Sequence, residues 1–291
     1  MPRSRFRTLV ATATAAMALA VPLAAVSSST AASAASSSKI TIKAGEYFYK
    51  ISGTPAPGNV EVVFDNSGSE IHMVAAASLK AGVTLKQVKA AFQSEDDSAF
   101  GKIAKGDGNV AGMPGLNSPG VSTTNIANLP AGHYAIFCFV PSSDGTPHVM
   151  DGMIKIFDVK GSKSTLKPPT DGVVDVTITD STITLPNGTL PKSGWIKVTN
   201  NGTAARDFTL AKYATSNTDF TSVDAEVGNF FQTGKWSSGS APVVLNGGVG
   251  GMAPNSSAYL EVTALASGKW VAVSSPNDDD STSIHTDFTI S

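Results

Sequence analysis

Apolar and polar residues alternate along short stretches of the chain, and turn-forming residues separate these stretches. Residues 39–43 read KITIK and residues 60–64 read VEVVF. A period of two is typical of β-strands that bury one face. The pattern predicts strands at 39–43, 47–49, 60–64, 72–77, 121–126, 134–140 and 153–159. Many short strands with turn signals between them indicate an all-β fold, an antiparallel sandwich or barrel.

One stretch has a helical pattern instead. Thr84 and Gln87 have the spacing of a capping box, and Leu85, Val88 and Phe92 follow as an apolar stripe. We predict a short helix that packs on the sheet. The charged, glycine-containing stretch 95–108 is predicted to be a loop.

The second part of the chain repeats the first. VFDNSGSEIHMVAAA (63–77) aligns with KVTNNGTAARDFTLA (197–211), and AGHYAIFC (131–138) aligns with SGKWVAVS (267–274). VKAAFQ (88–93), GNVAGMP (108–114) and the closing FDV (157–159) have counterparts in the same order, VGNFFQ (227–232), GGVGGMA (247–253) and FTI (288–290). Matches in one order along the chain indicate a tandem duplication.

The repeat defines the predicted domains. We expect two tandem Greek-key β-sandwiches at 39–160 and 172–291, each with a short helical insertion. Residues 161–171 contain two adjacent prolines and are predicted to be a linker. A duplication of this kind is expected to give each copy sheets of its own.

The N-terminus has the features of a secretory signal peptide over residues 1–34. Three arginines (Arg3, Arg5, Arg7) precede an apolar stretch, and Ala32-Ser33-Ala34 fits a cleavage site. No later stretch has the roughly 18 apolar residues of a membrane span. We expect an exported, soluble protein, with an uncleaved leader that acts as an anchor as the alternative.

Charge argues against two classes of partner. The formal net charge is −2, and loss of the three leader arginines makes it −5, with Arg206 as the one arginine left. A surface with this charge and no basic tract is a poor match for nucleic acid or an anionic membrane.

Candidate chemistry gathers around the only cysteine, Cys138. His148 and Met153 follow it in a polar loop and at the start of the next strand, and His72 lies earlier in the chain. A thiolate, two imidazoles and a thioether suit a soft transition metal, copper above all. The competing interpretation is that Cys138 is a small buried apolar residue, as free cysteines often are.

The repeat offers an internal comparison. His72 aligns with Arg206, Cys138 with Ser274 and Met153 with Ile284, and the loop that holds His148 shortens and has no histidine. All four groups disappear together in the second copy, as expected if they form one site. We therefore predict that residues 172–291 bind no metal and act as a spacer or a docking surface.

At these residues the chain resembles the cupredoxin family, the blue-copper β-sandwiches such as plastocyanin and azurin. NSGSEIH (66–72) resembles the family's first histidine after an Asn/Gly turn, and Cys138, His148 and Met153 resemble the ligands between the last two strands. The resemblance implies one copper ion, with Met153 as a weak axial ligand, and one-electron transfer. Nine residues separate Cys138 from His148, against two to four in typical members.

Two function classes follow. The first is an exported copper-binding protein with a type-1-like site, for one-electron transfer or copper handling, with an unknown redox partner or surface protein as its partner. The alternative is a metal-free binding or structural module at the cell surface. A copper enzyme is not expected, because only His133 and His285 remain for a catalytic copper centre and no H-x-H pair occurs.

Overall fold

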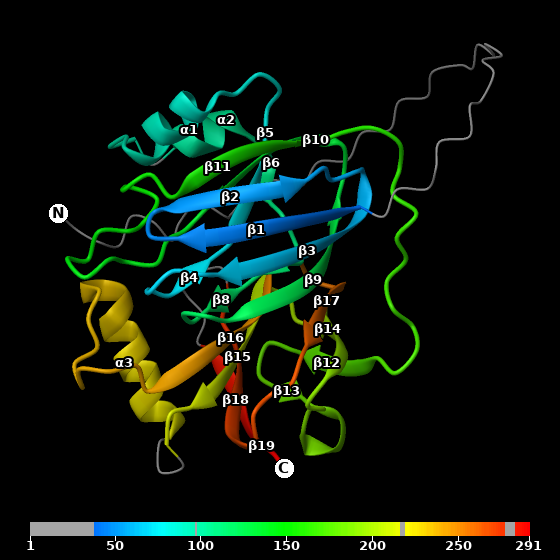
Figure 1. Cartoon of the computed structure of the whole chain (residues 1–291), viewed down its shortest axis with the longest axis vertical. Coiled ribbons are helices and arrows are strands. Elements are labelled where there is room, and N and C mark those ends of the chain that lie inside the picture. Colours follow the sequence, from blue (N-terminus) through cyan, green and yellow to red (C-terminus); the bar gives the residue numbers. More distant parts are fainter. Residues whose placement is uncertain (1–37, 97, 216–218, 277–282) are drawn as a thin grey trace.

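The computed structural model describes residues 38–291, apart from residues 97, 216–218 and 277–282 (Figure 1). The predicted signal peptide lies outside the described residues. The described chain is mostly β-strand, which confirms the predicted all-β fold class. Among its helices, none combines the length and the apolar character needed to cross a membrane.

The elements of each half are as follows. The first half contains β1 (Lys39–Gly45), β2 (Phe48–Gly53), β3 (Gly58–Asn66), β4 (His72–Met73), β5 (Ala75–Leu79), α1 (Leu85–Phe92), α2 (Ala99–Ile103), β6 (Ala104–Asn109), β7 (Met113–Pro114), β8 (Leu116–Asn117), β9 (Ser122–Leu129), β10 (Gly132–Phe137) and β11 (Ile154–Val159). The second half contains β12 (Val174–Ile178), β13 (Ile183–Thr184), a 3-10 turn (Pro186–Gly188), β14 (Gly194–Asn200), β15 (Arg206–Tyr213), α3 (Phe220–Thr233), β16 (Val243–Met252), β17 (Ser256–Val262), β18 (Gly268–Ser274) and β19 (Ile284–Ile290).

The largest sheet has the same strand order in each half. In the first half the order is β2-β1-β3-β9, and in the second it is β13-β12-β14-β17. In the first half, β1 forms an antiparallel hairpin with β2 and pairs in parallel with β3. In the second half, β12 does the same with β13 and β14. Residues 63–66 and 197–200, which we aligned by sequence, therefore lie in matching strands, β3 and β14.

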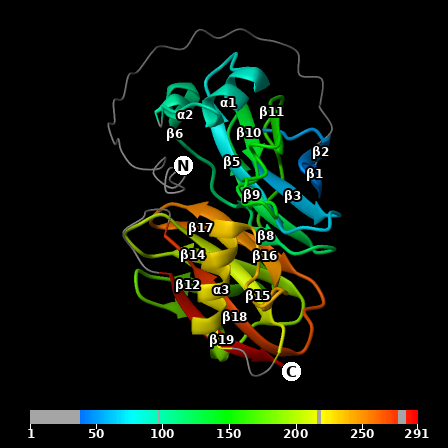
Figure 2. The same ribbon diagram turned by 90° about the vertical axis from the view of Figure 1, so that its left-hand side faces the viewer.

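The two halves nevertheless share sheets, which corrects the expectation that each half would have sheets of its own. β9 pairs with β17, so the two sets of four strands form one eight-stranded sheet. A seven-stranded sheet runs in the order β19-β18-β15-β16-β8-β4 and also crosses between the halves, with β7 paired to β16. In Figure 2, β16 and β17 of the second half lie directly against β8 and β9 of the first.

The cores follow from the alternation in sequence. β3 buries every second residue, among them Val60, Val62 and Phe64, as a half-buried strand should. One hydrophobic cluster contains Phe64 and Ile136 of the first half together with Leu245 and Phe230 of the second. The boundary between the halves is thus part of a continuous core.

The helices confirm one prediction and correct another. Thr84 and Gln87 form the predicted capping box of α1, which buries Val88 and Phe92 against the four-stranded sheet β11-β10-β5-β6. The predicted loop at 95–108 is wrong, because it contains α2 and β6. Phe100 and Ala104 explain the difference, since both are buried in the cluster that contains Phe92 and Phe137 and so anchor the segment.

Candidate metal centre

Three of the predicted ligands converge inside the first half. His72 lies in β4, Cys138 directly follows β10, and His148 lies in the loop before β11. All three are fully buried, and one donor atom from each lies within 4.8 Å of the others. His148 Nδ1 is 3.1 Å from His72 Nδ1 and 3.5 Å from Cys138 Sγ. Two imidazole nitrogens and one sulfur therefore face a common point.

An asparagine turn delivers His72 to this point. Asn66 ends β3, and its side-chain amide donates to the carbonyls of Glu70 and Asn117, both at 2.8 Å. Its side-chain oxygen accepts from Gly68 N at 3.0 Å. These bonds satisfy the polar atoms of a buried side chain and fix the course of residues 66–71.

The long interval between Cys138 and His148, residues 139–147, folds into a hairpin that we call the ligand-loop hairpin. Ser142 N donates to Thr146 O at 2.8 Å, and Gly145 takes a positive φ of 83° at the turn. His148 N then donates to Val140 O at 2.9 Å, and Val149 N to Cys138 O at 2.8 Å. The additional residues are thereby looped out, and His148 returns next to Cys138.

The fourth predicted ligand, Met153, is held by its backbone to two of the others. Met153 N donates to His148 O at 2.9 Å, and Cys138 N donates to Met153 O at 3.3 Å. The side chain is fully buried in the same hydrophobic cluster as Cys138. An axial role for its sulfur is part of the proposal below.

Burial sets the protonation states at the site. It lowers the pKa of His72 and that of His148 to about 4, so both rings are neutral near pH 7 and offer lone pairs. Burial also raises the pKa of the Cys138 thiol to about 11, although hydrogen bonds from the backbone of Met73 and Val140 oppose this effect. Without a bound cation, the thiol keeps its proton.

Several neighbours that sequence reasoning missed shape the site. Glu70 Oε2 lies 2.8 Å from His148 Nε2, outside hydrogen-bond geometry, and the Tyr47 ring packs edge-on against His148. His72 Nε2 is buried without a hydrogen-bond partner, next to Gly68. A Cβ at Gly68 would lie only 2.8 Å from that nitrogen. The repeated Asn/Gly turn was the one sequence signal that pointed to this region.

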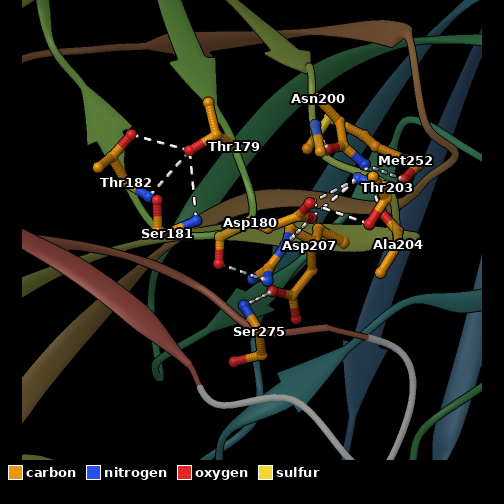
Figure 3. A network of polar contacts seen from close by, with 12 residues as sticks. Thr179, Asp180, Ser181, Thr182, Asn200, Thr203, Ala204, Asp207, Met252 and Ser275 are labelled. Atoms are coloured by element: carbon orange, nitrogen blue, oxygen red, sulfur yellow. Dashed lines mark hydrogen bonds and ion pairs between the residues drawn. The ribbon is translucent and has the colours of Figure 1, made fainter.

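The second half builds the same turn without the ligands (Figure 3). The side-chain amide of Asn200 donates to the carbonyls of Ala204 and Met252, both at 2.9 Å, and its oxygen accepts from Gly202 N at 2.9 Å. Arg206 follows in the place of His72, is buried, and donates from Nη2 to Asp180 O at 3.1 Å. Ser274, in the place of Cys138, is buried and its hydroxyl has no partner among the described residues.

The other two histidines lie outside the cluster. His133, in β10, faces Asp158 Oδ1 at 2.6 Å through Nδ1 and Val83 O at 2.7 Å through Nε2. His285, in β19, stacks on Phe220 with ring centroids 3.6 Å apart. Both rings have neighbours of their own, so neither joins His72 and His148.

The chain is similar to sodium-dithionite-reduced auracyanin from the photosynthetic bacterium Roseiflexus castenholzii, with 23% identity over 44% of this chain and 100% of that chain and a TM-score of 0.30. It is similar to auracyanin B, with 18% identity over 47% of this chain and 94% of that chain and a TM-score of 0.27.

Some structures that are similar over a larger share of the chain are copper enzymes. A multicopper oxidase matches at 11% identity over 87% of this chain and 88% of that chain, with a TM-score of 0.23. No protein-family model and no curated protein sequence matches the chain. The similar structures thus include both auracyanins and a copper enzyme, and at such TM-scores the chemistry of this chain has to be inferred from its own residues.

Proposed function

We propose that this chain is an exported protein that binds one copper ion between His72, Cys138 and His148, with Met153 as a weak axial ligand. The observation that carries the proposal is the convergence of one thiol and two neutral imidazoles at a buried point. Soft sulfur and imidazole donors of this kind favour copper, and a His2Cys set with a long axial Met is typical of electron-transfer sites.

The residues around the ligands fit this role. Copper bound at such a site accepts and releases one electron. Side-chain bonds of Asn66 hold the turn before His72, and backbone bonds hold the hairpin before His148, so the protein itself positions the two histidines. Full burial of the four side chains keeps water from the sulfur, and a rigid, dry site favours electron transfer with little rearrangement.

One-electron transfer or copper handling is favoured over catalysis. A catalytic copper centre would need further histidines, and the chain has only His133 and His285 besides the proposed ligands. These two face Asp158 and Phe220 from different halves of the chain. The alternative function, a metal-free surface module, has the same fold and differs only in whether the site takes up copper.

The proposal also includes a tandem duplication within the chain and the export of the protein. A duplication with copies at 39–160 and 172–291 and a linker at 161–171 is supported by the matching strand order and by the matching Asn66 and Asn200 turns. The mixing of strands from both halves in one sheet counts against it, because separate copies were expected to form separate sheets. Export is supported by the pattern of residues 1–34.

Copper titration of the mature chain tests the function. We expect one equivalent to bind tightly and to give the strong visible absorption of a copper–thiolate bond. Cys138→Ser should abolish this absorption and His72→Ala should weaken binding, whereas His285→Ala should change neither. A wild-type chain that shows no stoichiometric binding and no such absorption would leave the metal-free module as the function.

A further inference from the structure

The strand that carries His72 belongs to a sheet that the second half builds. In the order β19-β18-β15-β16-β8-β4, four strands come from the second half, and β4 is the outermost strand. Cys138 and Met153 instead flank β10 and β11 of the four-stranded sheet of the first half. The ligands of one site therefore come from two different sheets.

The link between β4 and the second half is the short strand β8. Asn117 pairs with His72 on one side and with Asn246 of β16 on the other. The next residue, Ser118, donates from its backbone N–H to Leu245 O at 3.0 Å, and its hydroxyl accepts from Leu245 N at 2.9 Å. Ser118 is buried, so this reciprocal pair is shielded from water and holds β8 firmly on β16.

The loop that carries His148 also rests on the second half. Gly234 caps the C-terminus of α3 with a φ of 72°, and a Cβ at this position would overlap the carbonyl oxygen of Ser142. Ser142 lies at the base of the ligand-loop hairpin, where it is bonded to Thr146. The backbone of α3 thus lies in direct contact with the segment that returns His148 to Cys138.

We infer that the second half is a structural part of the metal centre, and that Ser118 and Gly234 are positioning residues for His72 and His148. The inference rests on the proposed copper function and assigns the second half a role other than spacer or docking surface. β4 is held on β16 through β8, and the ligand-loop hairpin contacts the C-terminal end of α3. A change at this boundary therefore moves the histidines relative to Cys138. The geometry of the site, and not only the stability of the fold, then depends on the second half.

The first test is Ser118→Ala in the full chain. Loss of the hydroxyl leaves Leu245 N buried without its acceptor and loosens β8 on β16. We expect the copper–thiolate absorption to shift and copper affinity to fall about tenfold, as for other residues that orient ligands. Ser118→Thr keeps the hydroxyl and should restore both. Asn125→Ala is the matched control, because it removes another hydrogen bond across the boundary, to Gly248 O at 2.9 Å, from a strand that carries no ligand.

The second test is Gly234→Ala. The new methyl group has to displace the ligand-loop hairpin, so the absorption should shift and affinity should fall. Gly188→Ala is its control, since Gly188 has a similar φ of 70° but open space around it. Wild-type spectra in both Ser118→Ala and Gly234→Ala, or equal changes in variants and controls, would overturn the inference while leaving the copper function intact. Absence of copper binding in the wild type would instead refute the proposed function.

Discussion

The thiol of Cys138 couples metal binding to pH. Its pKa is raised to about 11 by burial, whereas the pKa of each proposed histidine ligand, His72 and His148, is lowered to about 4. Between these values the histidines carry no proton to lose, and the thiol must release one when a metal binds. Raising the pH therefore favours binding, and we expect the apparent copper affinity to increase about tenfold per pH unit from about pH 5 to about pH 10.

Competition against a chelator of known pH dependence measures this slope. Below about pH 4 the slope should become steeper, because the histidines also become protonated in the metal-free chain. An affinity that stays constant between pH 6 and pH 9 would show that Cys138 does not bind as a thiolate.

At the scale of elements, the two asparagine turns form a matched pair. Asn66→Ala and Asn200→Ala each remove three hydrogen bonds of a buried amide. Each should lower the free energy of unfolding by about 2–3 kcal/mol, because buried partners lose their bonds. Only Asn66 holds the strand of a proposed ligand, His72, so only Asn66→Ala should also weaken copper binding, by about tenfold or more. Denaturant unfolding and copper competition on both variants check this, and equal affinities would contradict it.

The strands were predictable where burial alternates, as in β1 and β3, because period two reports one buried face. The convergence of His72, Cys138 and His148 was predictable because these side chains are lost together in the second copy, whereas Met153 as a ligand stays a prediction. β4, β7 and β8 have two residues each and are too short to show a period. The pairing of β8 with β16 joins Asn117 to Asn246, and nothing local in either segment specifies so distant a partner.

At the scale of the molecule, equivalent strands of the two halves follow in the same order from the two edges of the large sheet, β2-β1-β3-β9 from one edge and β13-β12-β14-β17 from the other. β9 and β17 occupy matching places in the two halves and pair with each other, as equivalent strands do across a two-fold dimer interface. Pairing in this way removes an exposed edge from each half. Residues 161–171, the predicted linker, run along the first half through bonds such as Ser164 N to Pro57 O at 2.7 Å.

Shared sheets and a shared core should make the two halves unfold together. All three tryptophans (Trp195, Trp236, Trp270) lie in the second half, whereas the proposed copper ligands lie in the first. Copper bound to the native state stabilises it by mass action, and a hundredfold excess over the dissociation constant adds about 2.7 kcal/mol. We therefore expect copper to raise the denaturant concentration at the midpoint of the tryptophan transition. In the copper-bound protein, this midpoint should coincide with the midpoint at which the copper–thiolate absorption disappears. Cys138→Ser should show no copper-dependent rise. A tryptophan transition that copper leaves unmoved, with the absorption lost at a separate midpoint, would mean that the halves unfold independently and that the boundary between them transmits no stability.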